Sequence, residues 1–162
     1  MFPELYLYTK PADEGDNPVD SPNLRGQALS LFSRMATNGK VHRMIQTLKR
    51  RPSRLLDRAT FQSASCVPNQ HYAGQMSVPI DRIRGSEGRT EDFDDTFYPL
   101  HDRMRSRWLN VASMRLAGED LPSVELIHTG GIYFVRDGHH RISVAKALGE
   151  AYIDAEVTEV TC

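Results

Sequence analysis

The stretch Ile132-Tyr-Phe-Val-Arg-Asp-Gly-His-His-Arg-Ile-Ser-Val-Ala-Lys-Ala-Leu-Gly149 decides the fold of this chain. Its apolar start, Ile132 to Val135, predicts a buried strand, and Asp137-Gly138 predicts a tight turn after it. A helix is then expected from His140 to Leu148, because Gly149 accepts the left-handed conformation that ends a helix. A strand, a glycine turn and a helix in direct succession indicate an α/β fold.

The turn between this strand and this helix predicts a phosphate-binding site. A helix that begins at His139 or His140 presents unpaired N–H groups and the positive end of its dipole, which attract anions. Gly138 lets the backbone approach a ligand closely, and the forked guanidinium of Arg141 suits phosphate. The two histidines are expected to donate hydrogen bonds or move protons. In the alternative interpretation, Asp137 caps the helix and the histidines are ordinary surface residues.

The run Asp137-Gly-His-His-Arg141, followed by Ser143-Val-Ala-Lys-Ala-Leu-Gly149, resembles the nucleotide-binding signature of the ParB/sulfiredoxin-like superfamily. Three upstream segments are also similar to the amino-terminal domain of ParB proteins: Val78–Ile83, Gly85–Arg89 and Leu121–Leu126. The resemblance covers about residues 76–160. It implies a mixed α/β fold, with a small sheet and helices.

The resemblance also implies a ligand and the residues that hold it. The ligand would be a nucleoside di- or triphosphate (CTP, ATP or ADP), and five residues would bind its phosphates: Arg89, Gly138, His139, His140 and Arg141. Glu87 matches the position of the catalytic glutamate in the free-serine kinases of the superfamily, which makes it the candidate base. Asp137 is the second candidate catalytic residue, expected to hold Mg²⁺ through phosphate-bound water.

The sequence departs from two members of the superfamily. Sulfiredoxins carry a catalytic cysteine where this chain has His139, so reduction of a sulfinic acid is not expected. ParB proteins, which act in chromosome partitioning, continue into a helix-turn-helix domain and a dimerisation tail. This sequence ends at Cys162, so that DNA-binding part is expected to be missing. Whether the helices expected at 24–37 and 40–50 replace it is open.

The remaining elements follow from hydrophobic periodicity and from breakers. Asn38-Gly39 is expected to end the first of these two helices, and the second is expected to end before Pro52. Residues 60–75 predict a loop, and Phe2–Tyr8 alternates like an edge strand. A helix is expected over 102–117, with Trp108 in the core, and strands are expected at 78–83, 121–127 and 152–160. Thr129-Gly130-Gly131 predicts a hairpin between the strand at 121–127 and the strand at 132–135. The predicted organisation is an amino-terminal extension, 1–75, packed on a nucleotide-binding module, 76–162.

Charge is unevenly distributed along the chain. The whole carries 20 Lys and Arg against 21 Asp and Glu, a formal net charge of −1. Residues 25–58 nevertheless hold nine Lys and Arg and a single acid, Asp57, so this segment is +8. Such a basic face is typical of DNA binding, and the candidate contacts are Arg43, Lys49, Arg50 and Arg51. In the alternative interpretation this face packs against the chain's own acidic loops at 10–22 and 87–95.

Composition excludes several classes of protein. The 162 residues suit one domain, and 40% hydrophobic with 25% charged residues suit a globular core. No apolar run approaches the ~20 residues that span a bilayer, and no signal peptide is visible. The two cysteines have no metal-binding or redox spacing, which favours a cytoplasmic location. The acidic run at 91–95 is interpreted as a solvated loop, and no metal-ligand set is assigned.

The leading prediction is therefore a nucleotide-binding protein of ParB-like fold, with phosphohydrolase activity and DNA association open. Two alternatives stand beside it: a kinase of free amino acids, and a DNA-binding module without enzymatic activity. A homodimer is a further possible assembly.

Overall fold

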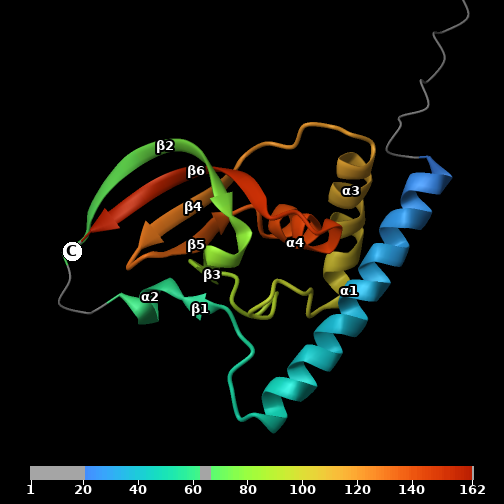
Figure 1. The fold of residues 1–162 in the computed structure, drawn as a ribbon, viewed down its shortest axis with the longest axis horizontal. Coiled ribbons are helices and arrows are strands. Elements are labelled where there is room, and N and C mark those ends of the chain that lie inside the picture. Colours follow the sequence, from blue (N-terminus) through green and yellow to red (C-terminus); the bar gives the residue numbers. More distant parts are fainter. Residues whose placement is uncertain (1–20, 63–66, 162) are drawn as a thin grey trace, which may run out of the picture.

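The computed structural model describes residues 21–62 and 67–161, and a six-stranded mixed sheet forms its centre (Figure 1). The strands lie in the order β1-β3-β5-β4-β6-β2. Their bounds are β1 Leu56–Asp57, β2 Asn69–Pro79, β3 Ile83–Ser86, β4 Val124–Thr129, β5 Ile132–Asp137 and β6 Tyr152–Thr161. The mixed α/β fold predicted from the sequence is confirmed. The strand predicted at 2–8 lies outside the described residues.

Parallel pairing in the middle of the sheet determines where the candidate site lies. β5 pairs antiparallel with β4, which confirms the predicted hairpin, and parallel with β3 on its other side. In the second pairing Ser86 lies opposite Val135. The carboxyl ends of β3 and β5 are therefore neighbours at one end of the sheet. Any loop that follows β3 must lie beside any helix that follows β5.

In the described part of the chain, four helices accompany the sheet: α1 (Pro22–Leu48), α2 (Arg58–Phe61), α3 (Arg105–Leu116) and α4 (His139–Leu148). Short 3-10 turns cover Ile80–Arg82 and Asp102–Met104. Figure 1 shows α1 running along α3, with α4 between α3 and the sheet. No helix in the described part of the chain is long and apolar enough to cross a membrane.

Trp108 joins the helices into one core, as predicted. It is fully buried among residues of α1, α3 and α4, and its ring meets Phe32 of α1 edge to face at 5.3 Å. Its indole N–H donates a hydrogen bond to the Ser143 hydroxyl of α4 at 2.8 Å. A second apolar core lies against the sheet and includes Ile142 of α4. Both sides of α4 are thus buried, which fixes its position against the end of β5.

The prediction of two amino-terminal helices is wrong, because α1 continues without a break through Asn38-Gly39. Gly39 is buried there, and a Cβ atom on it would lie 2.8 Å from Cβ of Tyr98. Gly39 therefore allows α1 to pack closely against the loop before α3. A local breaker signal cannot be distinguished from a packing requirement by sequence alone.

Two other boundaries differ from the prediction. β2 starts at Asn69, inside the segment 60–75 predicted to be a loop. Its polar residues remain exposed because β2 is an edge strand, ordered by its long antiparallel pairing with β6. The strand predicted at 78–83 is divided by the 3-10 turn at 80–82, and β3 then extends to Ser86, so Gly85 and Ser86 belong to a strand.

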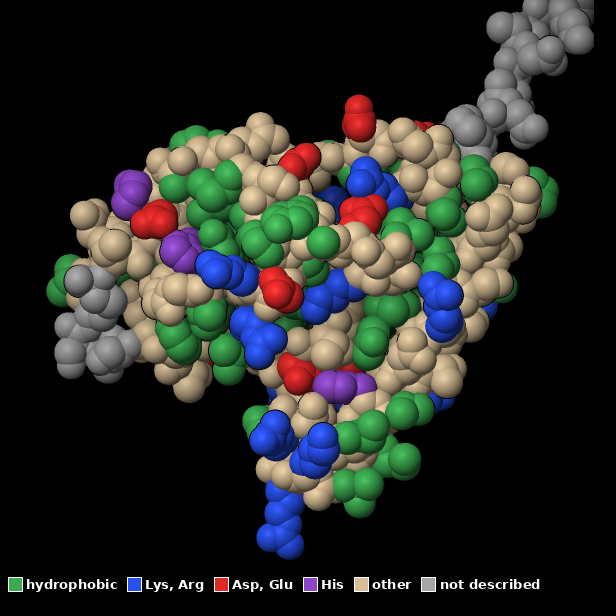
Figure 2. Space-filling model, viewed as in Figure 1, with side chains coloured by type: hydrophobic (Ala, Val, Ile, Leu, Met, Phe, Trp, Pro, Cys, Tyr) green, Lys and Arg blue, Asp and Glu red, His purple; other side chains and the backbone are tan. Residues whose placement is uncertain are grey.

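The carboxyl half of α1 leaves its apolar face in solvent. The exposed fractions are 47% for Val41, 61% for Met44, 40% for Ile45 and 78% for Leu48. Figure 2 shows hydrophobic and basic side chains together over this end of the molecule. Helical periodicity correctly predicts the helix here, but these apolar residues are not buried.

Candidate functional site

The candidate site lies where β5 turns into α4. The helix begins at His139, one of the two predicted starts. Gly138 precedes it with φ +101°, and a Cβ atom there would lie 2.5 Å from Cγ1 of Val124. Only glycine fits this conformation and this space. The N–H groups of its first turn have no intrahelical acceptor, and no side chain of the described residues caps them, so they remain available.

A cavity of about 200 Å³ opens at this helix terminus. Six of the residues predicted from the sequence line it together: Arg89, Asp137, Gly138, His139, His140 and Arg141. α3 and the loop after it contribute the remaining wall: Arg107, Val111, Met114, Leu121 and Pro122. The fold therefore brings the segment after β3 and the turn after β5 to one cavity.

Two arginines give this cavity its charge. Within the described residues, the guanidinium groups of Arg89 and Arg107 have no hydrogen-bond or ion-pair partner. Sequence reasoning missed Arg107. It precedes Val111 and Met114 at helical spacing, so all three lie on one face of α3. This helical spacing is visible in the sequence, but no local sequence pattern indicates that this face of α3 contacts the start of α4.

The two histidines of the cavity are neutral at pH 7. Burial lowers the pKa of His139 to about 4, and the positive charge of Arg89 contributes. Burial also lowers the pKa of His140 to about 4, with contributions from Arg107 and Arg89. Their rings can therefore donate or accept hydrogen bonds, while the positive charge of the cavity comes from the arginines.

Contacts with the interior hold both rings in place. His139 stacks on Phe93 at 5.9 Å between ring centroids, and its Nε2 lies 2.7 Å from Oγ of Ser86. His140 meets the same phenyl ring edge to face at 5.4 Å. Its Nδ1 is buried and has no hydrogen-bond partner in the described part of the protein. The alternative of a capping Asp137 and surface histidines is therefore wrong.

Arg141 is occupied by the protein itself. Its Nη1 donates hydrogen bonds to the carbonyl groups of Pro122, at 2.5 Å, and Ser123, at 2.7 Å. Its Nη2 donates to Oδ2 of Asp137 at 2.6 Å. The guanidinium thus ties the loop before β4 to the start of α4. Its direct role in phosphate binding stays a prediction.

Glu87 lies beside the cavity residues in sequence but does not line the cavity. Its carboxylate forms ion pairs with Arg136, at 2.9 Å, and with Arg58, at 2.8 Å. Burial opposes its ionisation, but the hydrogen bonds and charges of the two arginines prevail, so the pKa of Glu87 is lowered. A lowered pKa weakens a carboxylate as a base. Its catalytic role stays a prediction.

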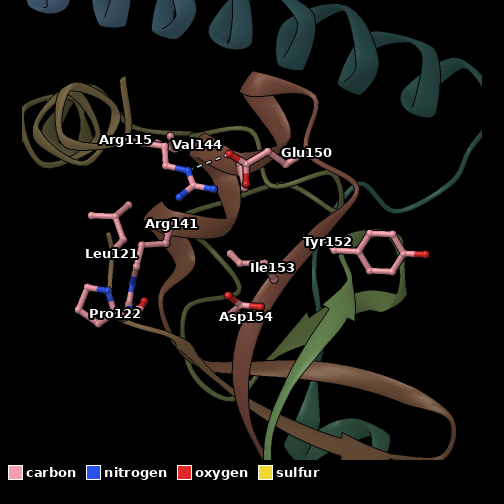
Figure 3. A pocket seen from close by; sticks show the side chains of 10 residues that line it. Arg115, Leu121, Pro122, Arg141, Val144, Glu150, Tyr152, Ile153 and Asp154 are labelled. Carbon is pink, nitrogen blue, oxygen red and sulfur yellow. Dashed lines mark hydrogen bonds and ion pairs between the residues drawn. The ribbon is translucent and has the colours of Figure 1, made fainter. Parts of the chain in front are cut away.

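A second cavity, of about 110 Å³, also has Arg141 in its wall (Figure 3). It shares Leu121, Pro122 and Arg141 with the first cavity. Figure 3 shows Arg115 and Glu150 joined across its wall, and their atoms Nε and Oε1 are 2.9 Å apart. Because its arginines are already paired, this cavity lacks the free positive charge of the first one.

The interpretation of the acidic run at 91–95 as a solvated loop is wrong for Asp94, because this residue has a structural role. Asp94 is fully buried and accepts hydrogen bonds from the backbone N–H groups of Thr96 and Tyr98. Asp95 lies 2.9 Å from His42 of α1. No group of three or more metal-ligating side chains occurs among the described residues.

The candidate DNA contacts separate into two sets. Arg43 is partly buried and forms an ion pair with Asp94 at 3.4 Å, so it packs against the acidic loop. Lys49, Arg50 and Arg51 follow the end of α1 and are exposed. Within the described part of the chain, their side chains have no ion-pair partner. Part of the basic segment therefore packs internally, and part of it remains free.

No protein-family model and no curated protein matches this sequence. Among solved structures, the chain is similar to sulfiredoxin from Arabidopsis thaliana, with 22% sequence identity and a TM-score of 0.36. The match covers 51% of this chain and 82% of the sulfiredoxin chain.

Proposed function

We propose that this protein binds the phosphate groups of a nucleotide in the cavity at the start of α4. One observation carries the proposal: Arg89 and Arg107 line one cavity with the N-terminus of α4, and within residues 21–62 and 67–161 the arginines have no counter-ions and the helix has no side-chain cap. Unpaired cations and unpaired N–H groups both favour an anion, and phosphate oxygens accept from both.

The neutral histidines add specificity to this charge. A phosphate oxygen can accept a hydrogen bond from an imidazole N–H without an additional positive charge. The buried Nδ1 of His140 leaves a polar atom for which the described protein supplies no partner. Asp137 is the carboxylate on the cavity wall. With a nucleotide bound, it would hold Mg²⁺ together with phosphate oxygens, since Mg²⁺ commonly takes one or two carboxylates and substrate phosphates.

Calorimetric titration tests the proposal directly. The ligands are CTP, ATP, ADP and inorganic pyrophosphate, each with and without Mg²⁺. We expect Arg89→Ala and Arg107→Ala each to weaken binding roughly tenfold to a hundredfold, the range for a hydrogen bond to a charged group. Arg105→Ala is the matched control, because Arg105 is an exposed arginine of α3 that does not line the cavity.

Absence of heat with all four ligands would refute the proposal. Equal effects of Arg105→Ala and Arg107→Ala would show that only net charge matters and that the cavity is not the site. A higher affinity for one nucleoside triphosphate than for pyrophosphate and for the other nucleoside triphosphate would identify the base that the protein prefers.

Phosphohydrolase activity is the catalytic extension of this proposal. It requires an oriented water and a stabilised phosphoryl group, and Arg89, Arg107 and Asp137 support such an arrangement. Release of inorganic phosphate from the preferred nucleotide, lost in Asp137→Asn, would support it. A kinase of free amino acids rests on Glu87, and the two ion pairs of that carboxylate do not favour it.

A second candidate function is association with DNA, favoured by the exposed run Lys49-Arg50-Arg51. Lysine and arginine contacts to phosphates give an affinity that falls steeply with salt. We expect duplex DNA to bind at low salt and the triple variant Lys49→Ala, Arg50→Ala, Arg51→Ala to reduce the salt dependence. A wild-type affinity that is weak and independent of salt would exclude this function.

A further inference from the structure

The hydroxyl group of Ser86 connects two walls of the phosphate cavity. Ser86 is the last residue of β3 and is fully buried. Its Oγ lies 2.7 Å from Nε2 of His139, the first residue of α4. The same oxygen accepts hydrogen bonds from the backbone N–H groups of Gly88, at 3.3 Å, and Arg89, at 3.1 Å. One buried oxygen therefore joins the Arg89 loop to the helix start.

The hydrogen atoms around this oxygen can be accounted for. A hydroxyl group has one hydrogen and two lone pairs, and two backbone N–H groups occupy the lone pairs. The hydroxyl hydrogen must then go to an acceptor. Two acceptors are within reach, Nε2 of His139 at 2.7 Å and the carbonyl oxygen of Val135 at 3.4 Å. The first distance is that of a strong hydrogen bond, and the second is at the outer limit.

We infer that Ser86 is a positioning residue, because its hydroxyl group donates a hydrogen bond to Nε2 of His139. The hydrogen of the neutral imidazole ring is then on Nδ1, and this N–H group donates a hydrogen bond to bound phosphate. The role toward phosphate rests on the proposed function, whereas the tautomer does not. Nδ1 of His139 has no hydrogen-bond partner among the described residues, and the ring lines the cavity. Stacking on Phe93 keeps the ring plane fixed.

Ser86 acts on both of these walls at once. Its oxygen holds the backbone of Arg89 in place, and its hydrogen orients His139. Replacement by alanine would remove both effects at once. Nothing else in the described protein would then hold Nε2 as an acceptor, so the two neutral tautomers would mix.

Nitrogen NMR of the ligand-free protein, labelled with ¹⁵N-histidine, tests the tautomer at pH 7. A protonated ring nitrogen and an unprotonated ring nitrogen give ¹⁵N signals in separate ranges. The signals of His139 are identified as those that are missing from the spectrum of His139→Gln. We expect a protonated Nδ1 and a bare Nε2 in the wild-type protein. A hydrogen on Nε2 would overturn the inference. An unchanged pattern in Ser86→Ala would overturn it as well.

Affinity for inorganic pyrophosphate tests the consequence, and Ser143→Ala is the matched control. Ser143 is also fully buried, and its hydroxyl accepts the hydrogen bond of Trp108, away from the cavity lining. Both variants lose buried hydroxyl hydrogen bonds. We expect Ser86→Ala to raise Kd about three- to tenfold, the equivalent of one lost hydrogen bond, and Ser143→Ala to leave it unchanged.

The outcomes separate this inference from the proposed function. Equal weakening by both serine variants would show a purely structural role for Ser86 and overturn the inference. If the wild-type protein binds no pyrophosphate, the proposed function fails, and the wild-type tautomer still tests the contact between Ser86 and His139. If Ser86→Ala does not fold, that same wild-type spectrum decides the question.

Discussion

The guanidinium of Arg141 lies 2.6 Å from the carboxylate of Asp137, four residues earlier, on the far side of the turn that opens α4. Both residues were predicted to serve a ligand. Only 16% of the Arg141 side chain is exposed, and its other nitrogen is bound to the carbonyl groups of Pro122 and Ser123. This arginine therefore orders the walls of the cavity, while Arg89 and Arg107 have no ion-pair partner among the described residues.

Loss of the Arg141 side chain should destabilise the protein. Arg141→Ala leaves two carbonyl groups and one carboxylate without their donor, so we expect the free energy of unfolding to fall by about 2 kcal/mol or more. Urea unfolding followed by circular dichroism measures it. Arg82→Ala, at an exposed arginine that forms no ion pair among the described residues, should change it by less than about 0.5 kcal/mol. Equal effects would contradict the assigned role.

Two glycines of α1 should respond in opposite directions to alanine. A Cβ atom on Gly26 would meet nothing within 4 Å, so Gly26→Ala should stabilise the protein by about 0.5–1 kcal/mol through helix propensity. A Cβ atom on Gly39 would lie 2.8 Å from Tyr98, so Gly39→Ala should destabilise it by about 1–3 kcal/mol. Thermal unfolding of both variants measures the difference. Stabilisation by Gly39→Ala would show that α1 does not pack there as described.

Acid should destabilise the protein through the two cavity histidines. Their pKa values of about 4 in the folded protein lie below the ordinary 6.5 of the unfolded chain. As pH falls from 6.5 to 4, the unfolded chain takes up protons that the folded protein does not, so the free energy of unfolding decreases. The loss is on the order of 3 kcal/mol for each histidine at most.

Urea unfolding at several pH values across this window measures the effect. His139→Gln and His140→Gln should each flatten the dependence on pH. His101→Gln, which replaces an exposed histidine outside the cavity, is the control. A wild-type stability that does not vary between pH 6.5 and 4 would show that these rings are not desolvated.

The exposed apolar face of α1 should contribute little to folding. Met44 and Leu48 are 61% and 78% exposed, so the double variant Met44→Ser, Leu48→Ser should change the free energy of unfolding by less than about 1 kcal/mol. Phe32→Ala in the same helix should cost about 3–5 kcal/mol, because Phe32 is buried against Trp108. A large loss in the double variant would show that this face is covered in solution.

Prediction from the sequence succeeded where structure depends on neighbouring residues. The strand, the Asp137-Gly138 turn and the start of α4 follow from a short apolar run, one glycine and one helical period. β6 and the hairpin of β4 and β5 followed from the same kind of local pattern. Gly39 misled the prediction, because its close approach to Tyr98 is a contact across 59 positions of the chain.

The sequence by itself determined a mixed α/β fold and the strand, turn and helix around Asp137-Gly138, because backbone preference and hydrophobic periodicity act over a few residues. Only the tertiary structure decided which side chains lie around that turn and which of them are bound by other parts of the protein. In the folded protein Arg107 of α3 lines the cavity, and Arg141 donates hydrogen bonds to the carbonyl groups before β4. Glu87 forms ion pairs with two arginines, and Ser86 contacts His139. These contacts arise from parallel pairing of β3 with β5 and from helix packing, which join segments far apart in the sequence.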